Sequence, residues 1–150
     1  MDPFQNEIYL KIFEKENSNS TNNNEIKNYK SWYSNSRQAS LAVYPDGTTG
    51  KSGFEKYMKK IQKKKINKYN LTLEFKKMFK NKNNKEKLDI LKKYSSKYAV
   101  IIKDIIENRD KCTLVYSSFV KGSGLILLAE LLKLFNYTET TTRNYSQKPS

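Results

Sequence analysis

The sequence contains no histidine, a single cysteine and only three prolines and five glycines. Without histidine, the chain has no imidazole general base, no Ser-His-Asp triad and no histidine metal ligand. Because Cys112 has no second cysteine to pair with, no internal disulfide forms, and a reducing compartment is expected. We expect Cys112 to lie in or beside a buried strand as a small hydrophobic side chain.

Long hydrophobic runs and a targeting segment are also missing. No apolar stretch approaches the roughly 20 residues that a membrane span needs. The N-terminal Met-Asp-Pro-Phe is not the basic patch and apolar block of a signal peptide. We therefore predict an intracellular protein without a membrane partner.

Acidic residues are scarce relative to basic ones. The chain has 29 lysines and arginines against 15 acidic residues, a net charge of +14. This excess favours an anionic partner, and nucleic acid, either DNA or RNA, fits first. An A+T-biased genome also enriches lysine and asparagine, so the charge has a compositional explanation as well.

Helical patterns dominate the first 93 residues. Asp2-Pro3 is a good helix start, and the apolar stripe that follows predicts a helix from Pro3 to about Glu16. An Asn-rich, low-complexity segment at 17–25 predicts a loop. Apolar positions at helical spacing predict further helices over 54–66 and 71–79, and a short one around Leu88 and Leu91.

Residues 94–137 have a different predicted secondary structure, which includes a strand. Ser95 and Ser96 stand at an N-cap position before an apolar helix face that begins at Tyr98. The segment Cys112–Tyr116 is short and apolar, as a buried parallel strand is. A glycine-containing loop then leads into a leucine-rich helix. Helix, strand, loop and helix in this order form the repeating unit of an α/β sheet, so we predict a mostly helical α/β fold.

The same stretch carries a family resemblance. Its pieces are Ser95-Ser96-Lys97, the run Val115-Tyr116-Ser117-Ser118-Phe119-Val120, Gly122-Ser123-Gly124 and Asn136-Tyr137. It resembles the opening of the second RecA-like domain of superfamily 2 helicases, in particular the Snf2-like helicases of nucleocytoplasmic large DNA viruses. In that family the strand and loop correspond to motif IV. Upstream, Phe4-Gln5 and Ser36-Arg37-Gln38-Ala39 also match, whereas Ser40, Leu41 and Ala42 depart from the pattern.

The resemblance implies a division of the chain into a helical linker region at 1–93 and the start of a RecA-like helicase lobe at 94–137. The tail at 138–150 has no apolar periodicity, and we expect it to be disordered. It implies a parent protein that is an ATP-dependent DNA or RNA translocase using ATP and magnesium. The partners would be nucleic acid and the remaining parts of the helicase polypeptide. Such a protein would act in the host cytoplasm, at the viral factory, or in the virion, and would serve early transcription.

Two groups of residues are candidates for nucleic-acid binding. The resemblance places Ser117, Ser118 and Lys121 in the motif IV loop, facing the nucleic-acid backbone. The lysine cluster of the predicted 54–66 helix contributes Lys59, Lys63 and Lys64, since clustered lysines neutralise phosphates. The alternatives are a plain strand end for the serines and a solvated helix face for the lysines. No residue is assigned a catalytic, cofactor-binding or metal-binding role.

ATPase machinery is incomplete in this sequence. Gly50-Lys51-Ser52 imitates a phosphate-binding loop, but Pro45 stands where that loop needs its first glycine, and proline has no N–H to offer a phosphate. A magnesium-binding acidic motif and an arginine finger are also missing. We therefore expect a helicase fragment, of marginal stability by itself, that cannot hydrolyse ATP. The alternatives are a small, basic, non-enzymatic nucleic-acid-binding protein and, third, a P-loop nucleotide binder.

Overall fold

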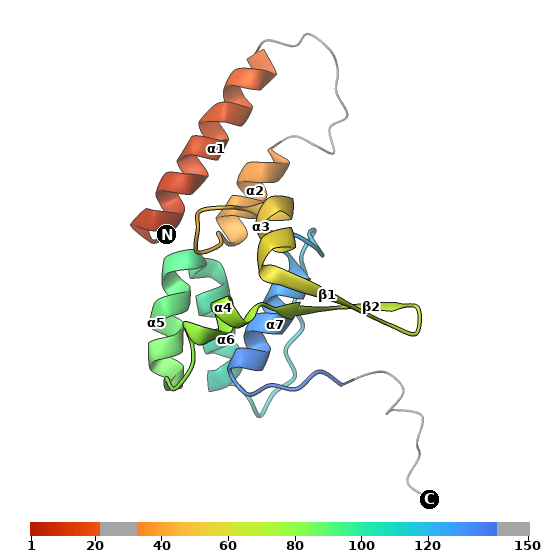
Figure 1. Cartoon of the computed structure of the whole chain (residues 1–150). Coiled ribbons are helices and arrows are strands. Elements are labelled where there is room, and N and C mark those ends of the chain that lie inside the picture. Colours follow the sequence, from red (N-terminus) through yellow and green to blue (C-terminus); the bar gives the residue numbers. More distant parts are fainter. Residues whose placement is uncertain (22–32, 141–150) are drawn as a thin grey trace, which may run out of the picture.

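The computed structural model describes residues 1–21 and 33–140. Its elements are α1 (Pro3–Thr21), α2 (Ser34–Leu41), α3 (Gly50–Tyr57), β1 (Met58–Lys63), β2 (Ile66–Leu71), α4 (Leu73–Lys77), α5 (Asn84–Tyr94), α6 (Ser96–Glu107) and α7 (Leu125–Leu134). The described part is mostly helical, with one two-stranded antiparallel sheet. The β1–β2 hairpin projects to one side of the helices, and α1 runs outward beyond the rest (Figure 1). None of the described helices is long and apolar enough to cross a membrane.

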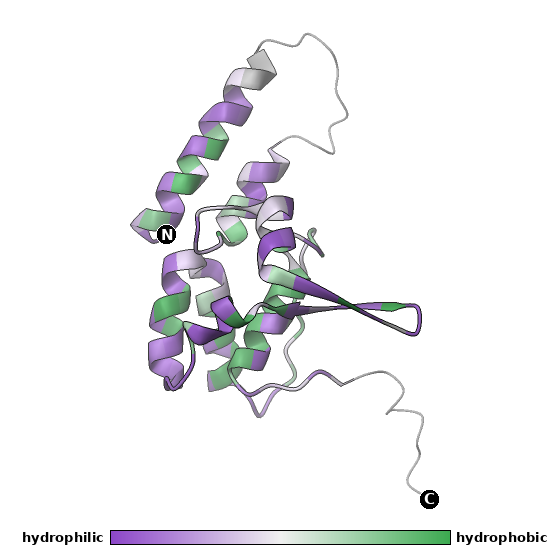
Figure 2. Ribbon diagram, in the orientation of Figure 1, coloured by the Kyte–Doolittle hydropathy of each residue, from purple (hydrophilic) through white to green (hydrophobic). Residues whose placement is uncertain are grey.

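One hydrophobic core joins segments that are far apart in the sequence. Tyr44 is fully buried, its ring stacks on Tyr57 with the centroids 5.4 Å apart, and its hydroxyl donates to the carbonyl of Gly122 at 2.7 Å. The leucine-rich α7, the most hydrophobic helix in Figure 2, adds Leu128 and Leu131 to the same core. The core thus contains residues from both sides of residue 93, and the domain division there stays a prediction.

The predicted helices around residue 95 are confirmed. The Ser95 side chain accepts a hydrogen bond from the N–H of Tyr98 and caps α6, as its position in the sequence indicates. Asn83 and Glu86 form a reciprocal capping box that starts α5, the short helix predicted around Leu88 and Leu91. The leucine-rich helix follows Gly124, also as predicted.

Helix α1 is longer than predicted. It continues past Glu16 to Thr21, so the predicted loop at 17–25 is wrong for 17–21, and 22–25 lie outside the described residues. The cause is tertiary: the Glu16 carboxylate accepts hydrogen bonds from the N–H groups of Asn35 and Ser36, at 2.9 and 3.1 Å, and caps the unpredicted helix α2. This contact holds the end of α1 in place despite its weak helix formers. Of the predicted tail at 138–150, residues 141–150 are likewise outside the described part.

The predicted helix over 54–66 is wrong beyond Tyr57. The chain instead forms β1 and returns through β2, with Met58 opposite Leu71 and Lys60 opposite Tyr69. Met58 and Leu71 are only 6% and 3% exposed, because the base of the hairpin packs into the core. The helix predicted over 71–79 is correspondingly reduced to α4, since Leu71 belongs to the strand.

The residues of the hairpin turn explain why the sequence did not predict the hairpin. Lys64 and Lys65 form a two-residue turn with φ angles of 45° and 66°. Such a turn favours Asn-Gly, because both residues need positive φ. A lysine in this left-handed region costs about 1–2 kcal/mol. The turn sequence that most strongly indicates a hairpin is therefore absent, and the lysine-rich run has the pattern of a helix.

The predicted buried strand at Cys112–Tyr116 is also wrong. No strand is formed there, Cys112 is exposed, and Leu114 and Tyr116 are 96% and 88% exposed. A parallel strand is held by ladder hydrogen bonds to neighbouring strands, and among the described residues β1 and β2 pair only with each other. Val115 alone packs against the core from this segment. The mostly helical part of the predicted fold class is thus confirmed, and its parallel strand is not.

Candidate nucleic-acid interface

A groove of about 600 Å³ lies between α3, the base of the β1–β2 hairpin and the loop at 117–122. Its lining includes Phe54, Lys60, Tyr69, Ser118, Phe119 and Lys121. Two of the predicted binding residues, Ser118 and Lys121, therefore meet the base of the lysine-rich hairpin in one concave surface. In the sequence these two groups are about fifty residues apart.

The position of the loop is set by buried hydrogen bonds at its end. Ser123 is fully buried, and its hydroxyl donates to the carbonyl of Ala42 at 2.9 Å. The carbonyl of Ser123 accepts a hydrogen bond from the hydroxyl of Tyr98 on α6. Burial raises the pKa of the Tyr98 hydroxyl well above its ordinary value, so this donor keeps its proton. Gly122 adopts a positive φ of 68°, which lets the chain turn into this arrangement.

The predicted loop residues differ in what they present to a ligand. The Ser117 hydroxyl accepts the N–H of Phe119 at 3.2 Å and thus stabilises the loop itself. Ser118 is exposed on the groove wall. The Lys121 ammonium lies 5.9 Å from the ring centroid of Tyr69, and the Arg37 guanidinium lies 5.2 Å from that of Phe119. Two aromatic residues of the groove lining, Tyr69 and Phe119, thus each have a cation over the ring.

The charge of the groove is positive. Lys51, Lys60 and Lys121 line it together with a single carboxylate, that of Glu55. Lys51 and Glu55 form an exposed ion pair with their charged atoms 3.8 Å apart. Lys60 and Lys121 remain as the excess positive charges, at the hairpin side and the loop side of the groove.

The predicted hairpin lysines extend this positive surface outward. The segment from Met58 to Leu71 holds six lysines and no acidic residue. Lys59 is exposed on the face of β1 opposite to Lys60, since neighbouring residues of a strand point to opposite faces. Lys64 is exposed at the tip, and Lys63 ends β1, with a side chain outside the described part. Lys59 and Lys64 thus lie on the hairpin and outside the groove.

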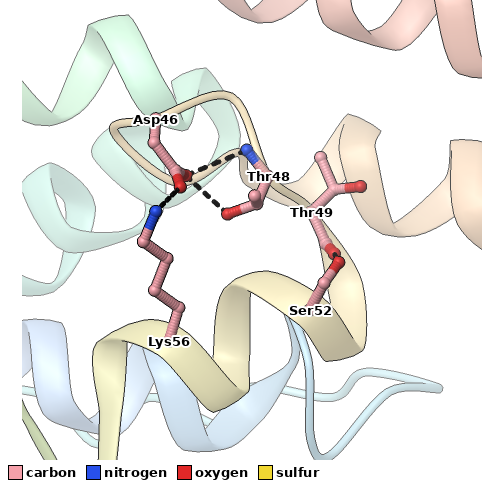
Figure 3. A network of polar contacts seen from close by, with 5 residues as sticks. All are labelled: Asp46, Thr48, Thr49, Ser52 and Lys56. Atoms are coloured by element: carbon pink, nitrogen blue, oxygen red, sulfur yellow. Dashed lines mark hydrogen bonds and ion pairs between the residues drawn. The ribbon is translucent and has the colours of Figure 1, made fainter.

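In the segment that imitates a phosphate-binding loop, 46–52, polar groups contact other residues of the chain. The Asp46 carboxylate accepts hydrogen bonds from the N–H and hydroxyl of Thr48, at 3.1 and 2.6 Å, and pairs with Lys56 (Figure 3). The N–H of Gly50 donates to the Ser123 hydroxyl at 3.4 Å, and the Lys51 side chain is 89% exposed. The Asp46 carboxylate and the N–H of Gly50 therefore both have partners within the chain. In the described ranges no three His, Cys, Asp or Glu side chains gather as a metal site requires.

The Asp46 contacts predict an acid-sensitive part of the stability. Desolvation opposes ionisation of this carboxyl, but hydrogen bonds from Lys56 and Thr48 outweigh it and lower its pKa to about 2. A lowered pKa stabilises the fold above the ordinary value of 3.8, and this stabilisation disappears as the pH falls toward about 2. Urea unfolding across this pH range should therefore show an acid-induced loss that Asp46→Asn reduces. Asp110→Asn, at an exposed position, is the control and should retain the loss.

The groove residues that the sequence did not indicate include Gln38, Phe54 and Tyr69. The side-chain amide oxygen of Gln38 accepts the N–H of Ser123 at 3.3 Å and links α2 to the loop. The alternation of Tyr69, Leu71 and Leu73 is a period-two signal that indicates a strand. Only Tyr69 could have been found in this way, because Gln38 and Phe54 lie on helices that meet the loop through the fold.

The chain is similar to parts of two curated viral proteins. It is 38% identical over 125 residues to "Putative helicase 087L" of Invertebrate iridescent virus 3, a match that covers 80% of this chain and 11% of that protein. It is 34% identical over 102 residues to "Putative ATP-dependent RNA helicase" of Heliothis virescens ascovirus 3e, covering 65% of this chain and 10% of that protein. The chain thus spans about a tenth of the length of the curated relatives it matches. Comparisons with protein families and with solved structures find no match.

Proposed function

We propose that this chain is a piece of a viral superfamily 2 helicase of the Snf2-like type. It would span the linker between the two lobes and the motif IV region of the second, RecA-like lobe. The similarity to two much longer viral proteins with helicase names supports this proposal. The apolar side chains of Leu114 and Tyr116, which are exposed here, would be covered by the rest of a longer polypeptide.

Within such a helicase, the proposed role of this chain is to hold the nucleic-acid backbone. The observation that carries the proposal is the groove, which places Ser118 and Lys121 beside Lys60. Ammonium groups neutralise phosphates and release counterions, and a hydroxyl adds a hydrogen bond to a phosphate oxygen. Lys59, Lys63 and Lys64 of the hairpin would extend the contact along the strand.

ATP hydrolysis belongs, in this proposal, to other parts of the polypeptide, which would bind ATP and magnesium. The Asp46 carboxylate and the occupied Gly50 N–H make the loop before α3 a poor phosphate site. An assay of ATP turnover by the isolated chain should give no activity. Turnover that depends on Lys51 would contradict the proposal.

The hairpin tip offers a clean test of nucleic-acid binding. The double variant Lys64→Asn/Lys65→Gly removes two cations and at the same time supplies the residues that the turn favours. We expect unchanged or higher thermal stability, together with a salt dependence of binding that is shallower by about 1 for each lost phosphate contact. Fluorescence anisotropy with labelled DNA and RNA at several salt concentrations measures the slope.

The matched control is Lys92→Gln/Lys103→Gln, which removes the same charge from α5 and α6, away from the hairpin tip (Figure 1). Its slope should equal that of the wild type. An equal decrease in both variants would mean that binding follows net charge alone, and the proposed interface would then be wrong.

A second candidate is a small basic protein that binds nucleic acid without any chemistry. The single core that links Tyr44, Gly122 and α6 favours it, because such a core suits a chain that is stable by itself. Cooperative unfolding of a monomer that binds tightly would support this candidate. Aggregation, or loss of fixed tertiary structure, would support the helicase fragment.

A further inference from the structure

The groove combines aromatic walls with a cationic rim. We propose that it accepts an unpaired base of a single-stranded nucleic acid, with Tyr69 and Phe119 as stacking surfaces and Lys60 and Lys121 on the flanking phosphates. The inference rests on the proposed nucleic-acid binding and goes beyond it, because it specifies a single strand and a contact to the base. Contacts to the nucleic-acid backbone by themselves require neither a single strand nor a contact to a base.

The aromatic rings are held in place from behind. Phe54 is buried and supports Tyr69, with the ring centroids 5.0 Å apart and the planes inclined by 59°. Tyr69 and Phe119 are both half-buried, so each keeps part of its ring toward the groove. The Arg37 guanidinium lies over the Phe119 ring, 5.2 Å from its centroid, and favours this orientation of the ring. Fixed rings lose little conformational freedom when a base stacks on them.

The cations border the same rings. Lys60 is the cross-strand partner of Tyr69, so both side chains point to one face of the hairpin. The Lys121 ammonium lies over the Tyr69 ring, 5.9 Å from its centroid, so a base that stacks there takes its place and the ammonium moves to the flanking phosphate. A base on Tyr69 would therefore bring its two adjacent phosphates within reach of an ammonium on either side. The carboxylate of Glu55 weakens the attraction for these phosphates only slightly, because it is paired with Lys51.

A duplex does not satisfy this arrangement. Its bases are covered on both faces by their neighbours, and it presents only phosphates and groove edges. The volume of about 600 Å³ lies in the range of sites that enclose a small ligand. An unstacked base of a single strand fits such a site, and stacking tolerates any of the bases. The groove should thus prefer single strands with little sequence dependence.

The test compares three probes at the same salt concentration with the full chain. They are a labelled thymidine oligomer of about 12 nucleotides, an abasic oligomer of equal length and charge, and a duplex of equal length. We expect the thymidine oligomer to bind about 10-fold more tightly than the abasic one. Tyr69→Leu should reduce thymidine binding to the abasic level without changing the salt slope, and Tyr69→Trp should retain it. Tyr116→Leu, at an exposed aromatic residue outside the groove, should have no effect.

Each outcome decides one of the two proposals. Equal affinity for the abasic and thymidine oligomers, with a normal salt slope, overturns the stacking inference and leaves phosphate binding intact. Tighter binding of the duplex, or binding of free thymidine monophosphate as tight as that of the oligomer, also overturns it. No binding of any oligomer overturns the proposed function itself. Circular dichroism of Tyr69→Leu and Tyr69→Trp separates a lost contact from a lost hairpin.

Discussion

The substitution Gly53→Ala is expected to destabilise the folded chain by about 3 kcal/mol. Gly53 lies in α3, where alanine would normally add about 1 kcal/mol of helix stability. Here a Cβ atom would lie 2.1 Å from the Tyr44 ring. That ring cannot yield, because it is fully buried, stacked on Tyr57 and hydrogen-bonded to Gly122. The free energy of unfolding, measured with urea, gives the loss.

The control for this substitution is Gly47→Ala. A Cβ there meets only the end of Ile8, at an ordinary distance of 3.5 Å, so the cost is confined to its positive φ of 85°. That cost is about 1 kcal/mol. Combining Gly53→Ala with Tyr44→Leu should recover part of the lost stability, as coupled neighbours do. A Gly53→Ala protein as stable as the wild type would show that α3 does not pack on Tyr44.

The substitution Gln5→Leu is expected to cost about 3 kcal/mol, because it leaves several buried polar groups without partners. Gln5 is fully buried, and its amide N–H donates to the carbonyls of Ala39 and Ser40 at 3.0 and 3.3 Å. Its amide oxygen accepts the N–H of Ser96 at 3.1 Å. One side chain thus satisfies the end of α2 and the start of α6, whose terminal backbone groups have no partners within their own helices.

The neighbouring Asn6→Leu is the matched control, since Asn6 is exposed on the same helix. It should change the free energy of unfolding by less than about 0.5 kcal/mol. Hydrogen exchange adds a local measurement: the Ser96 amide should exchange faster in Gln5→Leu and remain protected in Asn6→Leu. Similar losses in the two variants would mean that Gln5 acts only as part of the α1 surface.

Local signals predicted where α6 and α7 begin. The N-cap at Ser95, the apolar face that begins at Tyr98 and the leucine repeat after Gly124 each act within a few residues. These short-range interactions hardly depend on the rest of the chain, and α6 and α7 begin at the residues that make them. The end of α1 was missed, because the contact that extends it comes from Asn35 and Ser36 on another helix.

The two errors in strand prediction have a common cause. The Met58–Lys63 segment carries helix-favouring lysines, yet pairing with Ile66–Leu71 buries Met58 and Leu71 together. The Cys112–Tyr116 segment has the composition of a strand but no described partner to pair with. Strand formation depends on a neighbour, and composition over five or six residues does not show whether one exists.

The candidate site was partly predictable. Ser118 and Lys121 were named from the family resemblance, and the structure places both on the groove. Lys59 and Lys64 were named from charge, and both lie on the hairpin outside the groove. Their binding roles stay predictions until affinities are measured.

The sequence by itself determined the excess of positive charge, the absence of histidine and disulfide chemistry, and the helices whose caps and apolar faces lie within a few residues. These properties are sums over residues or short-range patterns. Only the tertiary structure decided that Tyr69 meets Phe54 and that Lys121 meets the hairpin. Such contacts arise because residues distant in the chain share one core, and the free energy of that burial exceeds any local preference.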